Sequence, residues 1–376
     1  MILPGATLGM LGGGQLGRMF TTAAQTMGYK VIVLDPDKNS PAGIIADQHI
    51  CAAYTDETAL TELAQHCAAI TTEFENIPAS TLAFLEKRTV VHPSSSALAS
   101  TQNRNTEKNF IHAQGIATVP FVRITSRDDF ADISTQIKFP AILKVATFGY
   151  DGKGQIVCED LQTAYEAFDA LGQKECVLEQ RIDLEREISV VLARGENGQI
   201  TAFPVAENVH INGILHSTSV PSAAAETQQK AAIEMASKIA DGLDYVGTMA
   251  VEFFVSKQGE IIANEIAPRP HNSGHYTLDA CRTSQFEQQV RMLCGLPAGS
   301  PKLISPVMMI NLLGDVWGNS QPAWDKLLNK PGIKLHLYGK REARAGRKMG
   351  HFNVLADTTD LAMQSANTVF EDIKAD

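Results

Sequence analysis

The first hundred residues alternate between short apolar runs and amphipathic stretches. Three apolar runs predict buried strands: 6–11, 29–34 and 68–73. The spacing of apolar positions predicts a helix that ends at Met27, before Gly28, and another over 57–67. The apolar start of the chain has no basic residue ahead of it, so we interpret it as part of the first strand rather than as a signal peptide. Strands that alternate with helices predict a parallel α/β sheet that ends near 92–96.

Beyond this boundary the pattern becomes richer in strands and hairpins. Strands are predicted at five places: 139–146, 155–159, 176–181, 188–193 and 200–205. An Ala-rich helix is predicted over 223–240, a hairpin over 246–266 and a further helix over 277–294. From about residue 300, short strands mix with Pro and Gly turns before a polar helical end. These patterns predict a mixed α/β (α+β) fold in three domains: 1–97, 98–299 and 300–376.

Composition narrows the function classes. The chain of 376 residues has a formal net charge of −10, which argues against non-specific binding of nucleic acid. Its six cysteines form no CxxC pair and no Cys/His spacing suited to zinc, so we expect reduced core residues of a cytoplasmic protein. No apolar stretch approaches the roughly 18 residues that cross a membrane. The basic residues that matter are therefore expected in local clusters that bind small anions.

A glycine-rich turn, Gly-Gly-Gly-Gln-Leu-Gly at 12–17, lies between the first strand and the first helix. Such a turn directs backbone N–H groups and the positive end of a helix at an anion. It also matches the GxGxxG pattern of dinucleotide-binding folds, with Asp35 ending the next strand. Any tight strand-to-helix turn favours glycine, so the pattern alone is weakly specific. We expect a site for a single phosphate here, with a dinucleotide site as the alternative.

A second glycine-rich loop, Phe-Gly-Tyr-Asp-Gly-Lys-Gly-Gln at 148–155, joins two predicted strands. Its glycines let the backbone lie over a polyphosphate, although a plain hairpin turn also favours glycine. Lys144 favours the phosphate interpretation, because it follows the apolar run 141–143 and a buried lysine requires an anionic partner. The loop lacks the GxxxxGK[ST] spacing of a P-loop.

Two glutamates predict a metal site on the hairpin at 246–266. A turn between Lys257 and Glu260 places Glu252 directly opposite Glu265. Like charges in such a pair destabilise a sheet, whereas hard oxygen ligands suit Mg²⁺ that carries ATP phosphates. Asn264 adds an oxygen beside them. A register shifted by one residue would instead leave a solvated face.

The loop after this hairpin carries Arg269, His271, Asn272, Ser273 and His275. Arginine suits a planar oxyanion such as bicarbonate, and histidine can transfer protons near neutral pH. We expect functional roles for Arg269 and His271, and a capped turn for His275.

Basic residues gather between 338 and 351, where five cations accompany one acid: Lys340, Arg341, Arg344, Arg347 and Lys348 against Glu342. In an acidic chain, such a cluster is typical of a site for a phosphate-bearing ligand. A solvated basic turn is the alternative.

Together these features resemble the ATP-grasp superfamily. Five sequences narrow the resemblance to the N5-carboxyaminoimidazole ribonucleotide synthetase family of bacterial and fungal purine biosynthesis: GGGQLGRM, TTEFENIP, TFGYDGKGQ, NEIAPRPHNSGHYT and YGKREARAGRKMGH. The resemblance extends from residue 6 to about 360. It implies an N-terminal parallel α/β domain that binds a ribonucleotide, a two-part ATP-grasp domain with a lid near 118–182, a small β-rich C-terminal domain, and a homodimer.

The resemblance also implies roles for individual residues, with the adenine of ATP on 179–182 and its ribose on Glu187. The residues expected to contact ATP are Arg104, Lys144, Gly149, Tyr150, Asp151, Gly152, Lys153, Gly154, Gln155, Glu179, Gln180, Arg181, Ile182, Glu187, His210, Asn264 and Glu265. Mg²⁺ is expected on Glu252 and Glu265. The residues expected to contact aminoimidazole ribonucleotide or bicarbonate are Gln15, Leu16, Glu73, Tyr150, Asp151, Arg269, His271, Asn272, Ser273, Lys340 and Arg347.

In the implied reaction, bicarbonate attacks the γ-phosphate of ATP, and the resulting carboxyphosphate passes its carboxyl group to the exocyclic amine of the ribonucleotide. Lys144 and Mg²⁺ would offset charge on the phosphates. Arg269 would hold the carbonate group, and His271 or Asp151 would take the amine proton. Three alternatives are a formate-using glycinamide ribonucleotide transformylase, a nicotinamide-dependent dehydrogenase and a catalytically silent nucleotide sensor.

Overall fold

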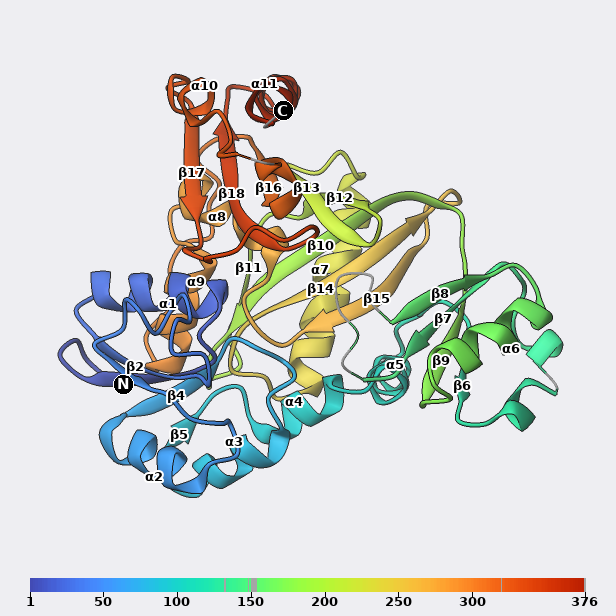
Figure 1. Cartoon of the computed structure of the whole chain (residues 1–376), viewed down its shortest axis with the longest axis horizontal. Coiled ribbons are helices and arrows are strands. Elements are labelled where there is room, and N and C mark those ends of the chain that lie inside the picture. The colour runs from blue at the N-terminus through green and yellow to red at the C-terminus, as the bar shows by residue number, and fades with distance from the viewer. Residues whose placement is uncertain (132, 148, 150–153, 319, 375–376) are drawn as a thin grey trace.

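The structure is a computed structural model that describes residues 1–131, 133–147, 149, 154–318 and 320–374. Over these residues the strands form three sheets. Figure 1 shows three lobes, and the C-terminal lobe shares the central sheet. The N-terminal lobe is blue, the lobe formed by the four-stranded sheet is green, and the C-terminal lobe is orange and red. The predicted mixed α/β architecture is confirmed.

The N-terminal sheet is parallel throughout, with strand order β3-β2-β1-β4-β5. Its strands are β1 (Thr7–Leu11), β2 (Lys30–Leu34), β3 (Gln48–Ile50), β4 (Ala69–Thr72) and β5 (Val90–Val91). Its helices are α1 (Gln15–Thr26), α2 (Glu57–His66) and α3 (Ala79–Glu86). One core joins the sheet to α1 and to α9 (Gln285–Leu293) from far along the chain, and a second core joins it to α2 and α3. The sheet is therefore covered on both faces, as its nearly continuous apolar strands require.

The central sheet has nine strands, and every pairing in it is antiparallel. They are β10 (Leu184–Arg194), β11 (Ile200–Ala202), β12 (Ala206–Ile211), β13 (Ile214–Val220), β14 (Gly247–Ser256), β15 (Ile261–Ala267), β16 (Val307–Leu313), β17 (Ile333–Leu337) and β18 (Lys348–Leu355). The C-terminal segment is β-rich as predicted, but its strands continue the central sheet because β16 pairs with β13. Two helices cover this end: α10 (Trp324–Leu328) and α11 (Thr359–Ile373).

The two faces of the central sheet differ in polarity. Ile188 and Val190 of β10 and Phe253 of β14 are buried against α7 (Glu226–Gly242) in one apolar core. Because side chains alternate along a strand, the intervening Glu187, Ser189 and Glu252 lie on the opposite face. That alternation places the polar side chains of the central sheet on the face that is not covered by α7.

The four-stranded sheet has the order β6-β9-β7-β8 and lies within the range predicted for the lid. Its strands are β6 (Phe121–Ile124), β7 (Ala141–Val145), β8 (Gln155–Cys158) and β9 (Cys176–Gln180), and α6 (Leu161–Ala170) packs on them. The helices α4 (Ser95–Thr101) and α5 (Arg104–Ala113) lead into it. The 3₁₀ turns are η1 (Arg127–Phe130), η2 (Ile133–Thr135), η3 (Asn272–Gly274) and η4 (Gly314–Trp317).

One predicted helix is wrong in its extent. The stretch 277–294 forms α8 (Thr277–Ala280) and α9, separated by extended backbone at Cys281. Cys281 forms a bridge with Leu303, and Ser284 begins α9 by accepting a hydrogen bond from the Glu287 N–H. A side-chain cap and a tertiary pairing thus override the helical spacing.

Two expectations from composition are tested by the structure. All six cysteines are free; five are buried, as predicted for core residues, but Cys51 is exposed. None of the described helices is long and apolar enough to cross a membrane.

Replacing Ile188 by alanine should destabilise the fold by about 2–5 kcal/mol, because its fully buried side chain leaves a cavity against α7. The measurement is urea unfolding followed by circular dichroism. Ile211→Ala is the matched control, since Ile211 lies in the same sheet and is 51% exposed, and its effect should stay within about 0.5 kcal/mol. Equal losses in the two variants would contradict this assignment of the core.

Candidate active site

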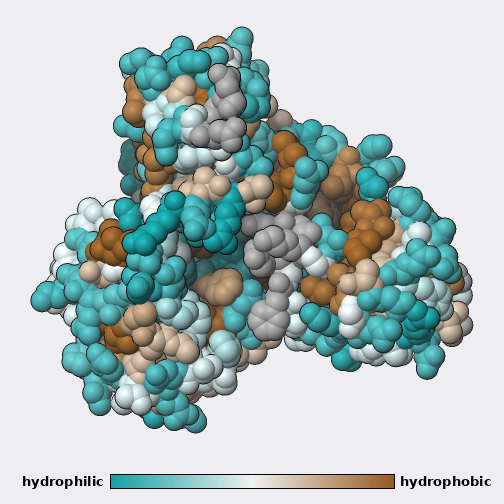
Figure 2. All heavy atoms as spheres, in the orientation of Figure 1, coloured by the Kyte–Doolittle hydropathy of each residue, from teal (hydrophilic) through white to brown (hydrophobic). Residues whose placement is uncertain are grey.

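The candidate site lies on the polar face of the central sheet, where the three lobes meet. Figure 2 shows the molecular surface hollowed at this place. Strands β10, β12, β14 and β15 supply the floor, and the loop after β15 supplies the residues above it. Most of the predicted site residues in the described part of the chain come together here.

Two carboxylates face each other across the hairpin formed by β14 and β15. Glu252 pairs with Glu265 as predicted, but the pairing shifts by one residue between Glu252 and Phe253, so that Asn264 is an extra residue in β15. Ala263 and Ile266 both lie in the core against α7, although residues three apart in a regular strand point to opposite faces. The bulge therefore leaves both Asn264 and Glu265 half-exposed, outside that core.

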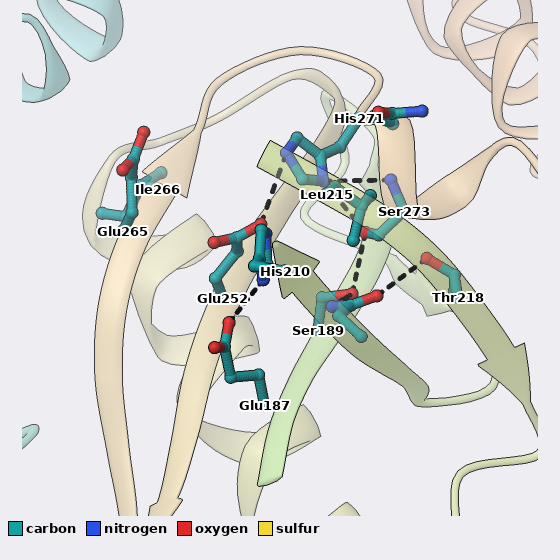
Figure 3. Close-up of polar contacts among 12 residues, drawn as sticks. Glu187, Ser189, His210, Leu215, Thr218, Glu252, Glu265, Ile266, His271 and Ser273 are labelled. Atoms are coloured by element: carbon teal, nitrogen blue, oxygen red, sulfur yellow. Dashed lines mark hydrogen bonds and ion pairs between the residues drawn. The ribbon is translucent and has the colours of Figure 1, made fainter. Parts of the chain in front are cut away.

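The carboxylate of Glu252 lies among histidines and other acids. Figure 3 shows it beside the rings of His210 and His271, and its Oε1 is 3.5 Å from His271 Nε2. Nδ1 of His210 lies 2.6 Å from Oε2 of Glu187. Burial raises the pKa of Glu252, and Glu265 and Glu187 raise it further. Burial alone would lower the pKa of His210, but Glu187 and Glu252 raise it. The site thus concentrates acids that a cation would stabilise.

Side chains on one face of helix α5 contact both the hairpin of β14 and β15 and the four-stranded sheet. Arg104 donates to Glu265 at 3.1 Å, and Glu107 accepts a hydrogen bond from the N–H of Ile266 at 2.5 Å. Burial and the charge of Glu265 raise the pKa of Glu107 to about 8. Lys108, on the same face of α5, forms an ion pair with Glu179 of β9. Only Arg104 was predicted, yet a spacing of three and four residues is the signal that would have found the other two.

A buried carboxylate on β9 binds two lysines. Oε2 of Glu179 lies 2.6 Å from Nζ of Lys144, and its Oε1 lies 3.0 Å from Nζ of Lys108. Burial alone would raise the pKa of Glu179, but Lys144 and Lys108 lower it to about 2. The sequence-based expectation that Lys144 needs an anionic partner is correct, and in the structure that partner is Glu179. The three groups together carry one net positive charge.

The segment predicted to receive adenine lines a pocket between the four-stranded sheet and the central sheet. The pocket is formed by Pro140, Gln180, Arg181, Ile182, Asp183, Ser256, Gln258, Glu260 and Ile262. One of its lining residues, Gln180, directly follows the ion-paired Glu179 in β9.

The glycine turn at 12–17 binds a carboxylate of the chain itself. The backbone N–H groups of Gly14 and Gly17 both donate to Glu73. A Cβ at Gly12 or Gly14 would lie 2.6 Å from the side chain of Glu73, which explains the glycines. Since these N–H groups already have an anion, the prediction of a phosphate in this turn is wrong. The dinucleotide alternative fails for the same reason.

The neighbouring predicted residues are partly structural. Gln15 and Leu16 begin α1, and the side chain of Leu16 packs into the core below. Burial raises the pKa of Glu73, although its backbone donors oppose this. The contact of these residues with a ribonucleotide stays a prediction.

Arg269 forms an ion pair that the sequence interpretation missed. Its Nε and Nη2 both donate to the carboxylate of Glu75, with Nη2 at 2.7 Å from Oε1. Burial opposes the charged guanidinium, but Glu75 holds the pKa of Arg269 above its ordinary value. The pair joins the N-terminal lobe to the loop after β15. Glu75 follows Glu73 by two positions in TTEFENIP, and that proximity is the signal that would have found it.

His271 caps the short turn η3. The backbone N–H of Ser273 donates to Nδ1 of His271, so this nitrogen carries no proton. The proton of the neutral ring is then on Nε2, which faces Glu252. Burial lowers the pKa of His271 well below its ordinary value, and Arg269 and Lys348 lower it further. In this tautomer Nε2 would have to release its proton before it could take one from the amine; the predicted role of His271 is not tested.

The remaining predicted residues of this loop are held in place from below. Asn272 exchanges two amide hydrogen bonds with Asn311 of β16, at 3.0 and 2.8 Å. The hydroxyl of Ser273 lies 2.9 Å from Nδ1 of His271. His275 is fully buried and bonded to Gln285, as expected for a structural residue.

The basic cluster forms the loop between β17 and β18. Lys340 donates to the carbonyl of Lys348 at 2.7 Å, and Arg347 donates to the carbonyl of Glu342 at 3.0 Å. A Cβ at Gly339 would lie 3.5 Å from Nη1 of Arg18, so the loop lies beside the start of α1, and the charge of Lys340 lowers the pKa of Glu73. Lys348, another member of the predicted basic cluster, lowers the pKa of Glu75, Glu252 and His271 by its charge.

Part of the second glycine-rich loop lies outside the described residues. The predicted residues there are Tyr150, Asp151, Gly152 and Lys153. Gly149 has no regular structure, Gly154 has a φ of +73° that favours glycine, and Gln155 pairs with Lys144. No role predicted for these residues is tested.

The Glu179→Gln variant tests the buried charge cluster. Because the folded pKa of Glu179 is below its ordinary value, its carboxylate stabilises the fold above about pH 4 and loses that effect as pH falls toward 2. Between pH 7 and pH 3, the free energy of unfolding should therefore fall by about 2 kcal/mol more in the wild type than in Glu179→Gln. Urea unfolding between pH 7 and 3 measures the difference. The exposed Glu166→Gln is the control, and parallel curves for all three proteins would refute the cluster.

Comparison with known proteins agrees with this geometry. Residues 5–102 match the ribonucleotide synthetase preATP-grasp domain, 109–286 the ATP-grasp domain, and 307–365 the phosphoribosylaminoimidazole carboxylase C-terminal domain. The N5-carboxyaminoimidazole ribonucleotide synthase of Bacillus subtilis is 44% identical over 360 residues, 96% of this chain and 94% of that protein.

Solved structures show the same likeness. The Staphylococcus aureus N5-carboxyaminoimidazole synthetase with ADP has a TM-score of 0.93 at 38% identity, over 98% of both chains. The Aspergillus clavatus synthase with ADP and 5-aminoimidazole ribonucleotide has a TM-score of 0.89 at 29% identity, over 98% of this chain and 99% of that one. The chain therefore belongs to the N5-carboxyaminoimidazole ribonucleotide synthase family, the ATP-grasp ligases that carboxylate aminoimidazole ribonucleotide with ATP in purine biosynthesis.

Proposed function

We propose that the chain uses bicarbonate as its carboxyl donor and that the described cleft carries out both steps. A bicarbonate oxygen attacks the γ-phosphorus of ATP and ADP leaves, which forms carboxyphosphate. The exocyclic amine then attacks the carboxyl carbon, phosphate leaves and the amine loses a proton. The observation that carries this proposal is the convergence of Lys144, Arg104 and the facing Glu252 and Glu265 on one face.

The proposed ATP site extends from the pocket at 180–182 to the glutamate hairpin. The relatives solved with ADP or ATP support a nucleotide in this fold. Lys144 would move from Glu179 to the phosphates, while Lys108 keeps the buried carboxylate paired. Glu187 and His210 would meet the ribose at the edge of the same face.

The residues present fit Mg²⁺. Glu252 and Glu265 offer hard oxygen ligands, and the raised pKa of Glu252 indicates carboxylates that a cation would stabilise. Over the described residues no cluster of three or more His, Cys, Asp or Glu side chains is placed to hold a metal alone. Two carboxylates would thus hold the ion together with the ATP phosphates, as is usual for Mg²⁺. When bound, it would neutralise phosphate charge.

The proposed carboxylation site lies between the N-terminal lobe and the loop after β15. Glu75 orients the guanidinium of Arg269, whose remaining donors would hold bicarbonate beside His271. Lys340 and Arg347 would meet the phosphate of the ribonucleotide, in place of the glycine turn. Asp151 remains the proposed acceptor of the amine proton. The homodimer, the cytoplasmic location and the three domain boundaries also remain proposals from the resemblance.

The first experiment is a coupled assay of ADP release with Mg-ATP and bicarbonate. Turnover should require aminoimidazole ribonucleotide and yield an acid-labile carbamate. Turnover with formate and glycinamide ribonucleotide instead would keep the fold and overturn the substrate. Binding of NADH without ATP would favour a dehydrogenase.

Lys144→Ala should lower kcat for ADP formation by at least about 100-fold, because a phosphate cation is lost. Lys174→Ala is the control, since Lys174 is an exposed lysine of the same lobe, and its kcat should match the wild type. Unchanged ADP formation in Lys144→Ala would exclude the proposed role.

Glu75→Gln should raise the KM for bicarbonate about 10-fold and leave the KM for ATP near the wild-type value. The reason is that the amide cannot hold the guanidinium of Arg269 with two charged hydrogen bonds. Steady-state kinetics with each substrate varied in turn measures the split. A rise in the KM for ATP alone would contradict the assignment.

A further inference from the structure

A chain of buried hydrogen bonds runs from the central sheet to His271. Thr218 of β13 donates to Oδ1 of Asn208 at 2.9 Å, and Nδ2 of Asn208 donates to the hydroxyl of Ser189 at 2.9 Å. The hydroxyl of Ser189 donates to that of Ser273 at 2.8 Å, and the Ser273 hydroxyl lies 2.9 Å from Nδ1 of His271. Figure 3 shows this chain crossing beneath the imidazole ring.

The chain has a direction. An amide nitrogen can only donate, so Asn208 donates a hydrogen bond to the hydroxyl of Ser189. The hydroxyl of Ser189 in turn donates a hydrogen bond to the hydroxyl of Ser273. The hydroxyl proton of Ser273 is then left for Nδ1 of His271. The backbone N–H of Ser273 also donates to this nitrogen, and a backbone N–H has no other option. Both donors require an unprotonated Nδ1.

None of these groups has water as a competing partner. Three of the residues, Ser189, Thr218 and Ser273, are fully buried, and Asn208 is 5% exposed. A buried polar group that loses its partner costs about 1–3 kcal/mol, so the alternative direction of the chain is disfavoured. Buried polar residues on the polar face of β10 and β12 are therefore not explained by packing alone.

We propose that Asn208 and Ser189 are positioning residues that fix His271 as the tautomer protonated at Nε2. The ring then enters the site as a hydrogen-bond donor beside Glu252, directed at the anionic oxygen of bicarbonate or of carboxyphosphate. The wrong tautomer would present a lone pair to that oxygen and repel it. This inference rests on the proposed place of bicarbonate near Arg269 and His271.

The test is the nitrogen spectrum of the ligand-free protein labelled with ¹⁵N-histidine, at neutral pH. The His271 signal is assigned by its loss in His271→Gln. In the wild type, Nδ1 should give the shift of an unprotonated nitrogen and Nε2 that of a protonated one. The opposite pattern in the wild type overturns the proposal without any variant, and it does so independently of substrates, so it does not depend on the proposed reaction.

Asn208→Asp is the decisive variant, because a carboxylate only accepts and the hydroxyls of Ser189 and Ser273 would turn toward it. The proton of His271 should then shift toward Nδ1, and kcat should fall about 10-fold while the KM for ATP stays unchanged. Ser189→Ala, which breaks the chain, should give a mixture of tautomers.

Ser217→Ala is the matched control, since Ser217 is buried on the same strand as Thr218 but lies outside the hydrogen-bond chain. It should leave both the tautomer and kcat at wild-type values. A wild-type His271 spectrum in both Asn208→Asp and Ser189→Ala would overturn the proposal.

Discussion

The need to pair buried charges determines how the three lobes meet. Glu179 is only 4% exposed, and it remains ionised because Lys108 from α5 and Lys144 from β7 contact its two oxygens. An isolated carboxylate in such a place would be neutral or would prevent folding. Glu265 with Arg104 and Glu75 with Arg269 follow the same rule, and in each pair the partners come from segments far apart in the chain. The cleft is thus built from ion pairs between elements.

These ion pairs also explain how the charged cleft can bind anionic ligands. In the absence of ligand, two of the cations that are expected to meet a phosphate or a carbonate already have a carboxylate partner: Lys144 has Glu179, and Arg269 has Glu75. An incoming anion replaces or shares that partner, so it need not organise free side chains. Lys108 has no direct access to the solvent, and its part is to keep Glu179 satisfied during this exchange.

Irregular backbone directs the chemistry on a regular scaffold. The bulge at Asn264 lets β15 keep Ala263 and Ile266 in the core while two consecutive polar residues stay outside it. The turn η3 uses His271 as its cap, so Nδ1 of the ring accepts a backbone hydrogen bond before any substrate arrives. In both places a small departure from a regular strand or loop positions a side chain of the candidate site.

The sequence by itself determined the main secondary-structure elements and the kinds of chemical site that they carry. Alternation predicted the N-terminal parallel sheet and the glutamate hairpin, and an apolar run with Lys144 inside it predicted a buried ion pair, because these signals lie within a few residues. The tertiary structure decided the partners. Only the folded chain shows that Glu73 fills the glycine turn, that Lys108 and Glu75 complete the ion pairs, and that a hydrogen-bond chain through Ser273 links Asn208 and Ser189 to His271. Those contacts join residues up to 194 positions apart in the sequence. A local sequence pattern does not specify which distant charge or hydrogen-bond donor will contact a given residue in the folded chain.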